Sequence, residues 1–162
     1  MSKKIGRVFT DGACSGNPGG PGGWAAVFSI NSKNKNEERI LRGGEKETTN
    51  NRMELIAVIE AVEKICKSKR IKHFEIYSDS AYVVNAINMH WIISWKLSKW
   101  KTSRGGDVKN SDLWERLDNG LQKAKQKGIK IDTIKVKGHN GNPLNEYADS
   151  IAKEQVLKQK GK

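Results

Sequence analysis

The chain has 162 residues and a net charge of +12, with 30 Lys and Arg against 18 Asp and Glu. This length fits one globular domain, for which about 150 residues is typical, so we expect residues 1–162 to form a single domain. The excess of positive charge predicts a polyanionic partner or an anionic membrane surface.

Composition excludes a membrane-spanning protein and a zinc site. No apolar stretch approaches the ~20 residues that a membrane span requires, and the N-terminal MSKKIGR lacks the apolar core of a signal peptide. We therefore expect a cytoplasmic protein without membrane contact, and we expect a monomer. The two Cys and three His have no zinc-type spacing, so oxygen ligands must hold any metal ion.

The first half of the chain predicts strands followed by a helix. Residues 5–11, 24–31 and 39–44 predict an antiparallel meander, in which the polar stretch NSKNKNEE forms a turn. Over residues 50–67 the apolar residues recur at helical spacing behind a pair of threonines, which predicts a capped helix packed on the sheet.

The second half alternates strands and helices. Strands are predicted over residues 73–79 and 129–137, with helices over 79–88 and 111–127 between them. The last helix begins at Asn142-Pro143, where Asn suits the N-cap and Pro the first helical position. This order of elements predicts an α/β fold, a mixed sheet with helices on its faces.

Four acidic residues stand beside apolar segments. Asp11 and Asp79 each end a predicted strand, and if these strands are parallel neighbours their carboxylates lie close together. Glu54 lies about 80° from the centre of the apolar stripe of its helix. Asp149 lies beside the buried stripe of the last helix. All four are therefore predicted to face inward.

Converging carboxylates repel one another unless hard cations lie between them, and Mg²⁺ or Mn²⁺ meets that need with oxygen ligands. Two such ions about 4 Å apart activate a water and stabilise the entering and leaving oxygens of a phosphodiester. Taken singly, each acid could instead be a helix cap or a turn residue. The four together predict a two-metal site.

Four motifs, which span about residues 5 to 155, resemble the type 1 ribonuclease H family in content, order and spacing: FTDGACSGNPGGPGGW, TTNNRMEL, YSDSAYV and VKGHNGNPLNEYAD. The resemblance implies a ribonuclease H-like fold with a five-stranded mixed sheet flanked by helices. It also implies divalent-metal-dependent endonucleolytic hydrolysis of the RNA strand of RNA/DNA hybrids, with 5′-phosphate and 3′-hydroxyl ends.

The resemblance implies catalytic roles as well. Asp11, Glu54, Asp79 and Asp149 correspond to the metal ligands, and His139 to a loop histidine that helps proton transfer and product release. Glycines near this histidine let its imidazole swing, which suits a proton carrier near neutral pH. A solvated loop histidine is the alternative.

Substrate contacts are implied in three groups. Short polar side chains can bond 2′-hydroxyls and base edges in a wide, shallow minor groove, one site grips a phosphate of the DNA strand, and a channel holds that strand. The residues are Cys14, Asn17, Asn50 and Asn51 for the minor groove, Thr49 and Asn110 for the phosphate, and Trp91, Trp95 and Ser103 for the channel. The two adjacent asparagines could otherwise merely begin a helix.

The sequence departs from the family's pattern at three positions. Glu47 stands where several members have Arg, and Ser94 replaces an amide found in others. These two departures leave the strength of the phosphate grip open. Ala81 replaces a longer side chain, which leaves one base contact open.

Residues 91–104, WIISWKLSKWKTSR, interleave tryptophans with basic residues and contain no acid. Cations suit phosphates and indoles pack against sugars, so this segment predicts contact with a DNA strand and resembles the family's basic protrusion. Indoles four residues apart can instead be core packing. That interpretation is preferred for Trp114 and stays open for Trp100.

Two other functions remain open from the sequence. A DNA-cutting nuclease with a transposase-like core shares the carboxylates, but the His139 loop and the asparagines disfavour it. A non-catalytic nucleic-acid-binding protein would use the positive charge alone. The complete acidic set disfavours this second function, because spare carboxylates weaken phosphate binding.

Overall fold

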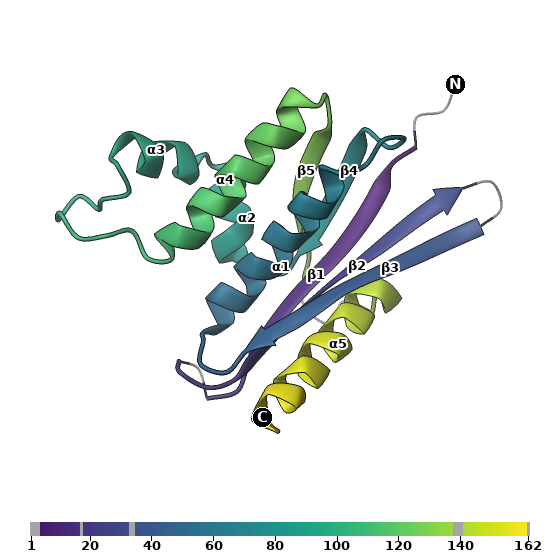
Figure 1. Cartoon of the computed structure of the whole chain (residues 1–162), viewed down its shortest axis with the longest axis horizontal. Helices are drawn as coiled ribbons and strands as arrows, with labels where there is room; N and C mark the ends of the chain where they lie inside the picture. The colour runs from purple at the N-terminus through teal and green to yellow at the C-terminus, as the bar shows by residue number, and fades with distance from the viewer. Residues whose placement is uncertain (1–3, 17, 33–34, 138–140, 162) are drawn as a thin grey trace.

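The computed structural model describes residues 4–16, 18–32, 35–137 and 141–161 (Figure 1). One sheet contains five strands in the order β3-β2-β1-β4-β5. Strands β1 to β3 pair antiparallel, whereas β4 and β5 continue the sheet in parallel with β1, so the sheet is mixed as predicted. The strands are β1 Gly6–Cys14, β2 Gly22–Ser32, β3 Lys35–Glu45, β4 His73–Ser78 and β5 Lys130–Lys135.

Helices cover both faces of the sheet (Figure 1). The larger core lies between the sheet, α1 and α4, and the smaller core lies between the sheet and α5. Within the described ranges, no helix combines the length and apolar character needed to cross a membrane. The helices are α1 Asn50–Ile65, α2 Ala81–Asn88, α3 Trp91–Leu97, α4 Ser111–Gln126 and α5 Pro143–Lys160.

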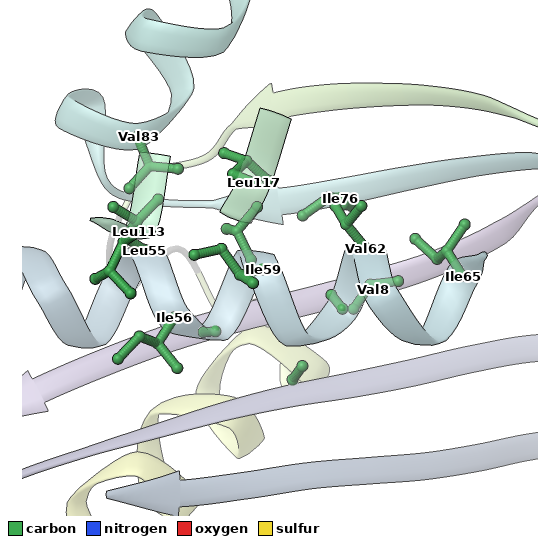
Figure 2. Packing of buried hydrophobic residues seen from close by; sticks show 14 of the residues in the cluster. Val8, Leu55, Ile56, Ile59, Val62, Ile65, Ile76, Val83, Leu113 and Leu117 are labelled. Carbon is green, nitrogen blue, oxygen red and sulfur yellow. The ribbon is translucent and has the colours of Figure 1, made fainter. Parts of the chain in front are cut away.

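Helix α1 is the centre of the larger core. Thr49 caps it, because its Oγ1 accepts a hydrogen bond from the Arg52 backbone N–H at 3.1 Å. Figure 2 shows apolar residues of α1, such as Ile59, close to Leu117 of α4 and to residues of the sheet. This burial fixes the position of the first turns of α1, which carry Glu54.

The strands are longer than the sequence predicts. β1 does not end at Asp11, because its antiparallel pairing with β2 continues to Cys14↔Gly22 after its parallel pairing with β4 has ended at Phe9↔Tyr77. The β2–β3 hairpin also extends into the polar stretch expected as a turn, since backbone pairing there does not depend on apolar side chains.

Candidate active site

Asp11 and Asp79 come together because β1 and β4 are parallel neighbours. Each acid lies two residues beyond the last parallel pair, Phe9↔Tyr77. Strand β4 ends at Ser78, one residue before the predicted end, so Asp79 directly follows it. Asp11 lies within β1 and does not end it, but it stands where the parallel part of the sheet ends. Ligands of such sheets gather at the carboxyl ends of parallel strands.

Glu54 joins these two acids because α1 lies directly against β1. A Cβ atom at Gly12 would clash with the backbone of Met53 and Glu54, so glycine at this position permits the close approach. The carboxylates of Asp11, Glu54 and Asp79 each offer an oxygen, and these oxygens lie within 4.8 Å of one another. The predicted convergence of these three acids is present in the structure.

Asp149 reaches the same place from α5. The start of this helix is fixed by an N-cap at Asn142, as predicted. The Asp149 carboxylate pairs with Lys153 Nζ at 3.0 Å, one turn further along the helix, and this contact raises the pKa of the lysine. Asp149 lines a cavity of about 20 Å³ together with four other residues: Asp11, Asp79, Asn145 and Glu146.

Without a bound cation, this carboxylate cluster is electrostatically unfavourable. Burial raises the pKa of Asp11 from 3.8 to about 8, with Asp149 and Asp79 adding to the shift. Burial also raises the pKa of Glu54 well above its ordinary value, with further contributions from Asp79 and Asp11. Both residues are nearly inaccessible, with exposed fractions of 7% for Asp11 and 4% for Glu54.

A divalent cation fits this set of donors. The donors are carboxylate oxygens, which Mg²⁺ and Mn²⁺ prefer. The buried Oε1 of Glu54 has no hydrogen-bond partner among the described residues, and a buried polar atom without a partner is costly. A bound cation would satisfy that oxygen and offset the mutual repulsion of the carboxylates.

The predicted minor-groove residues lie close to this cluster in the chain. Cys14 ends β1, and its Sγ contacts the carbonyl oxygens of Gly20 at 3.6 Å and Thr48 at 3.5 Å. These contacts hold the end of β1 against the segment that leads into α1. Asn50 and Asn51 are the first two residues of α1, one turn before Glu54.

Two predicted site residues, Asn17 and His139, lie outside the described residues. Their roles in the minor groove and in proton transfer therefore stay predictions from the motifs.

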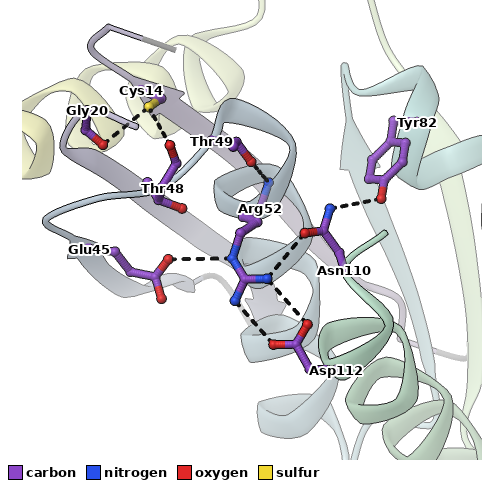
Figure 3. A network of polar contacts seen from close by, with 9 residues as sticks. All are labelled: Cys14, Gly20, Glu45, Thr48, Thr49, Arg52, Tyr82, Asn110 and Asp112. Atoms are coloured by element: carbon purple, nitrogen blue, oxygen red, sulfur yellow. Dashed lines mark hydrogen bonds and ion pairs between the residues drawn. The ribbon is translucent and has the colours of Figure 1, made fainter. Parts of the chain in front are cut away.

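The two predicted phosphate residues are joined through Arg52 (Figure 3). Thr49 Oγ1 accepts from the backbone N–H of Arg52, and Asn110 Oδ1 accepts from its guanidinium at 3.2 Å. The guanidinium also makes two bonds to Asp112, at 3.2 and 3.3 Å, and thereby lowers the pKa of that carboxyl. Glu47, where several family members have Arg, is exposed.

The predicted channel residues lie on α3 and in the segment that follows it. Trp91 and Trp95 have ring centroids 6.3 Å apart, and Trp95 lies 5.2 Å from Trp114 of α4. Trp114 is completely buried, which confirms its preferred place in the core. Trp100 is partly buried and also packs on the core. Ser103 is exposed, as are the two other departures from the family's pattern, Ala81 and Ser94.

Two of the lysines expected to meet phosphates have acidic partners within the protein. Lys96 Nζ lies 2.9 Å from Oδ2 of Asp118, a buried residue of α4, and this pair ties α3 to α4. Lys101 pairs with Asp107 across the loop that follows α3. These contacts position the basic segment but reduce the unpaired positive charge that it presents.

A family model for RNase H matches residues 3–157. The chain belongs to the ribonuclease H family. It is 49% identical to the ribonuclease H of Dechloromonas aromatica (strain RCB) over 155 residues, 96% of this chain and 95% of that protein. It is 50% identical to the ribonuclease H of Bradyrhizobium sp. (strain ORS 278) over 149 residues, 92% of this chain and 88% of that protein.

Among solved structures, the chain resembles LC9-RNase H1, a type 1 RNase H with the type 2 active-site motif, with a TM-score of 0.81. The identity is 28%, and the match covers 98% of this chain and 75% of that one. The predicted ribonuclease H-like fold is therefore confirmed. Members of the ribonuclease H family cleave the RNA strand of RNA/DNA hybrids endonucleolytically, and this chain is a nuclease of that kind.

Three residues of this ribonuclease H site could not be found from the sequence. Asn110 bonds Arg52 and Tyr82, and Arg52 in turn bonds Asp112. The three residues come from three different helices: Arg52 from α1, Tyr82 from α2 and Asp112 from α4. Arg52 lies within the TTNNRMEL motif, three residues after the capping Thr49, and that position was its one signal in the sequence. Tyr82 likewise lies within the YSDSAYV motif, three residues after Asp79, whereas Asp112 lies in none of the motifs.

Proposed function

We propose that Asp11, Glu54, Asp79 and Asp149 hold two Mg²⁺ ions, with Mn²⁺ as a substitute, for hydrolysis of the RNA strand. The cluster of three carboxylates within 4.8 Å carries this proposal, because its two buried acids have raised pKa values and need a cation. When bound, ions of this kind promote ionisation of the attacking water and stabilise charge on the phosphate. The products have 5′-phosphate and 3′-hydroxyl ends.

The RNA strand is recognised next to these carboxylates. Asn50 and Asn51 precede Glu54 by one helical turn, about 5.4 Å along the axis. Amides placed there can bond 2′-hydroxyls while the carboxylates face the scissile phosphate. Cys14 belongs to the same group because it contacts the backbone just before α1. Asn17 joins this group on the strength of its motif.

His139 serves as the proton carrier. In the sequence it lies between β5 and α5, and α5 brings Asp149 to the carboxylate cluster. An imidazole exchanges a proton near neutral pH, so it can accept a proton near the scissile phosphate and release it to solvent.

The DNA strand lies on the other side of α1, along α3 and α4. Thr49 and Asn110 grip one phosphate, since both side chains are held in place around Arg52. Trp91, Trp95 and Ser103 line the channel for the strand, with the indole of Trp95 packed between Trp91 and the buried ring of Trp114.

The chain acts as one domain over residues 1–162, an assignment supported by one sheet with a core on each face. We also propose that the protein acts as a monomer in the cytoplasm, with an RNA/DNA hybrid as its partner. Size-exclusion chromatography with light scattering tests whether the protein is a monomer in solution.

Strand choice is the decisive experiment. Labelled RNA/DNA hybrid, duplex RNA and duplex DNA are incubated with the protein and Mg²⁺ at matched salt, and the product ends are identified by mass. We expect cleavage of the RNA strand of the hybrid alone, because duplex DNA offers no 2′-hydroxyl to the asparagines. Comparable cleavage of all three duplexes would overturn the proposal, and cleavage of duplex DNA alone would favour the transposase-like alternative.

Metal binding is tested separately from turnover. Titration calorimetry with Mg²⁺ should detect binding to the wild-type protein and a much weaker signal for Asp79→Asn, which removes one ligand charge and little volume. Unchanged Mg²⁺ binding in this variant would remove Asp79 from the site.

A further inference from the structure

The amide of Asn110 is held from both ends (Figure 3). Its Oδ1 accepts a bond from Arg52 Nη1 at 3.2 Å, and its Nδ2 donates to the hydroxyl oxygen of Tyr82 at 3.0 Å. A guanidinium can only donate hydrogen bonds, so Arg52 fixes which end of the amide is the oxygen. The NH₂ group must then face Tyr82.

Asn110 does not use this amide for its own helix. It is the N-cap residue of α4, but within the described part of the chain its side chain makes no capping bond. Its backbone is left-handed, with φ of 61°, a conformation that Asn tolerates better than most residues. An NH₂ group carries two hydrogens, and Tyr82 takes one of them. The other has no acceptor among the described residues and is left for a ligand.

Tyr82 also holds a second donor. Its hydroxyl oxygen accepts a bond from Trp114 Nε1 at 3.1 Å, and its ring meets that indole edge-on, with centroids 5.3 Å apart. Trp114 in turn lies 5.2 Å from Trp95, which lies 6.3 Å from Trp91. One hydroxyl therefore connects the phosphate residue Asn110 with the tryptophans that back the DNA channel.

We propose that Tyr82 is a positioning residue, which aims the Asn110 NH₂ group at a phosphate of the DNA strand and sets its place relative to the channel tryptophans. The inference rests on the proposed function, in which Asn110 meets that phosphate. Phosphates and sugars of one strand are linked covalently, which limits their separation, so the groups that bind them must keep a matching separation. The Tyr82 hydroxyl is the contact shared by the two groups.

The test uses Tyr82→Phe, which keeps the ring against Trp114 and removes the hydroxyl. Its substrates are hybrids in which one phosphate of the DNA strand at a time is replaced by an uncharged methylphosphonate. For the wild type we expect one position at which the replacement raises KM about tenfold or more, as losing a charge-assisted hydrogen bond should. For Tyr82→Phe we expect KM on the unmodified hybrid to rise several-fold with kcat unchanged.

The increases in KM caused by Tyr82→Phe and by the modified phosphate should not be additive. At the sensitive position, Tyr82→Phe should lose most of the wild-type sensitivity, because its amide no longer aims at that phosphate. A merely structural role for Tyr82 would lower stability and raise KM equally on both hybrids. Equal sensitivity in the variant and the wild type therefore overturns the inference while the proposed function stands.

Tyr77→Phe is the matched control. Tyr77 is also half-buried and also loses its hydroxyl hydrogen bonding in the variant, here a single bond to Glu75 at 2.8 Å, but it packs in the smaller core with α5. Its KM values on the unmodified hybrid and on the methylphosphonate hybrids should match those of the wild type. If the wild type shows no sensitive phosphate, the proposed phosphate site fails and this inference fails with it.

Arg52→Lys provides a second variant, should Tyr82→Phe fold poorly. It keeps the positive charge but loses the planar group that bonds Asn110 and Asp112 together. The amide is then held from one end only, so we expect the same loss of sensitivity at the same phosphate. Full wild-type sensitivity in Arg52→Lys overturns the inference.

Discussion

Replacing Asp11 by Asn is expected to abolish cleavage and, in the metal-free protein, to stabilise the fold at pH 8. The two effects have one cause. Burial and the neighbouring Asp149 and Asp79 raise the pKa of Asp11 from 3.8 to about 8, so the ionised carboxylate that would serve a cation is unfavourable without one. Asn keeps the volume and cannot ionise.

This pKa determines how the free energy of unfolding changes with pH. A carboxyl that has a higher pKa in the folded chain than in the unfolded chain stabilises the fold fully below pH 3.8, and this stabilisation is lost as the pH rises to about 8. The shift is about 8 − 3.8, roughly 4 units, which at about 1.4 kcal/mol per unit gives a ceiling of ~6 kcal/mol.

Coulomb repulsion within the cluster gives a second value for the free-energy cost of ionising Asp11. Two carboxylate oxygens at 4.8 Å, the upper limit of the separations in this cluster, repel by ~3.5 kcal/mol at an effective dielectric constant of about 20. The neighbouring carboxyls can take up the proton that Asp11 loses, which reduces the gain from removing one of them. We therefore expect Asp11→Asn to be about 2–4 kcal/mol more stable than the wild type at pH 8 in EDTA, and this advantage to shrink to about 1 kcal/mol or less at about pH 4.5.

Urea unfolding in EDTA at these two pH values measures the differences, and cleavage of hybrid in Mg²⁺ measures activity, which should fall ~10²-fold or more. Asp118→Asn is the control. Asp118 is 7% exposed, like Asp11, but it has a cation partner in Lys96 at 2.9 Å, so its loss should destabilise the fold. An Asp11→Asn variant that is less stable at pH 8, or whose advantage does not grow with pH, would refute the reasoning.

Three further substitutions and a change of metal ion test other parts of the site. Gly12→Ala places a Cβ against the backbone of α1, so hybrid cleavage should fall at least about tenfold, whereas Gly106→Ala, whose Cβ meets only a side-chain oxygen at 3.6 Å, should cleave normally. Lys99→Ala should reduce the salt dependence of log KM by about one unit. Lys96→Ala should mainly lower stability in urea, since it leaves buried Asp118 without this partner. A change in stability for Lys99→Ala together with a change in salt dependence for Lys96→Ala would contradict these assignments. Ca²⁺ should support hybrid binding in a filter assay without cleavage, because its larger and looser shell suits two aligned small ions poorly, and robust cleavage with Ca²⁺ would count against the two-metal site.

The sequence predicted the parts of the site that depend on local pattern. Strand and helix periodicity placed Asp79 at the end of a strand and Glu54 at the edge of an apolar stripe, and the N-cap signals at Thr49 and Asn142 correspond to real caps. The convergence of the acids followed once β1 and β4 were assumed to be parallel neighbours, which they are. Periodicity could not show that β1 continues to Cys14, because that depends on which partner strand pairs with it there.

Contacts between distant segments were beyond the sequence. Arg52 and Asn110 are 58 residues apart, and Asn110 and Tyr82 are 28 apart. Their meeting depends on how α1, α2 and α4 pack, and no residue pattern within one helix specifies it. The same holds for Lys96, whose composition-based role as a phosphate contact took no account of Asp118, 22 residues away on α4.

The acids of this protein have two different roles, and their partners distinguish them. On the side proposed for the DNA strand, Asp112 holds Arg52 and Asp118 holds Lys96, so each acid fixes a cation in place and the pair stabilises the fold. In the carboxylate cluster, Lys153 pairs with Asp149, but no basic side chain among the described residues forms an ion pair with Asp11 or Glu54. A single Asp-to-Asn change would relieve this repulsion if stability were all that mattered. In a chain of net charge +12, where basic side chains are plentiful, an unneutralised acidic cluster is the strongest physical argument that the missing positive charge comes from outside the protein.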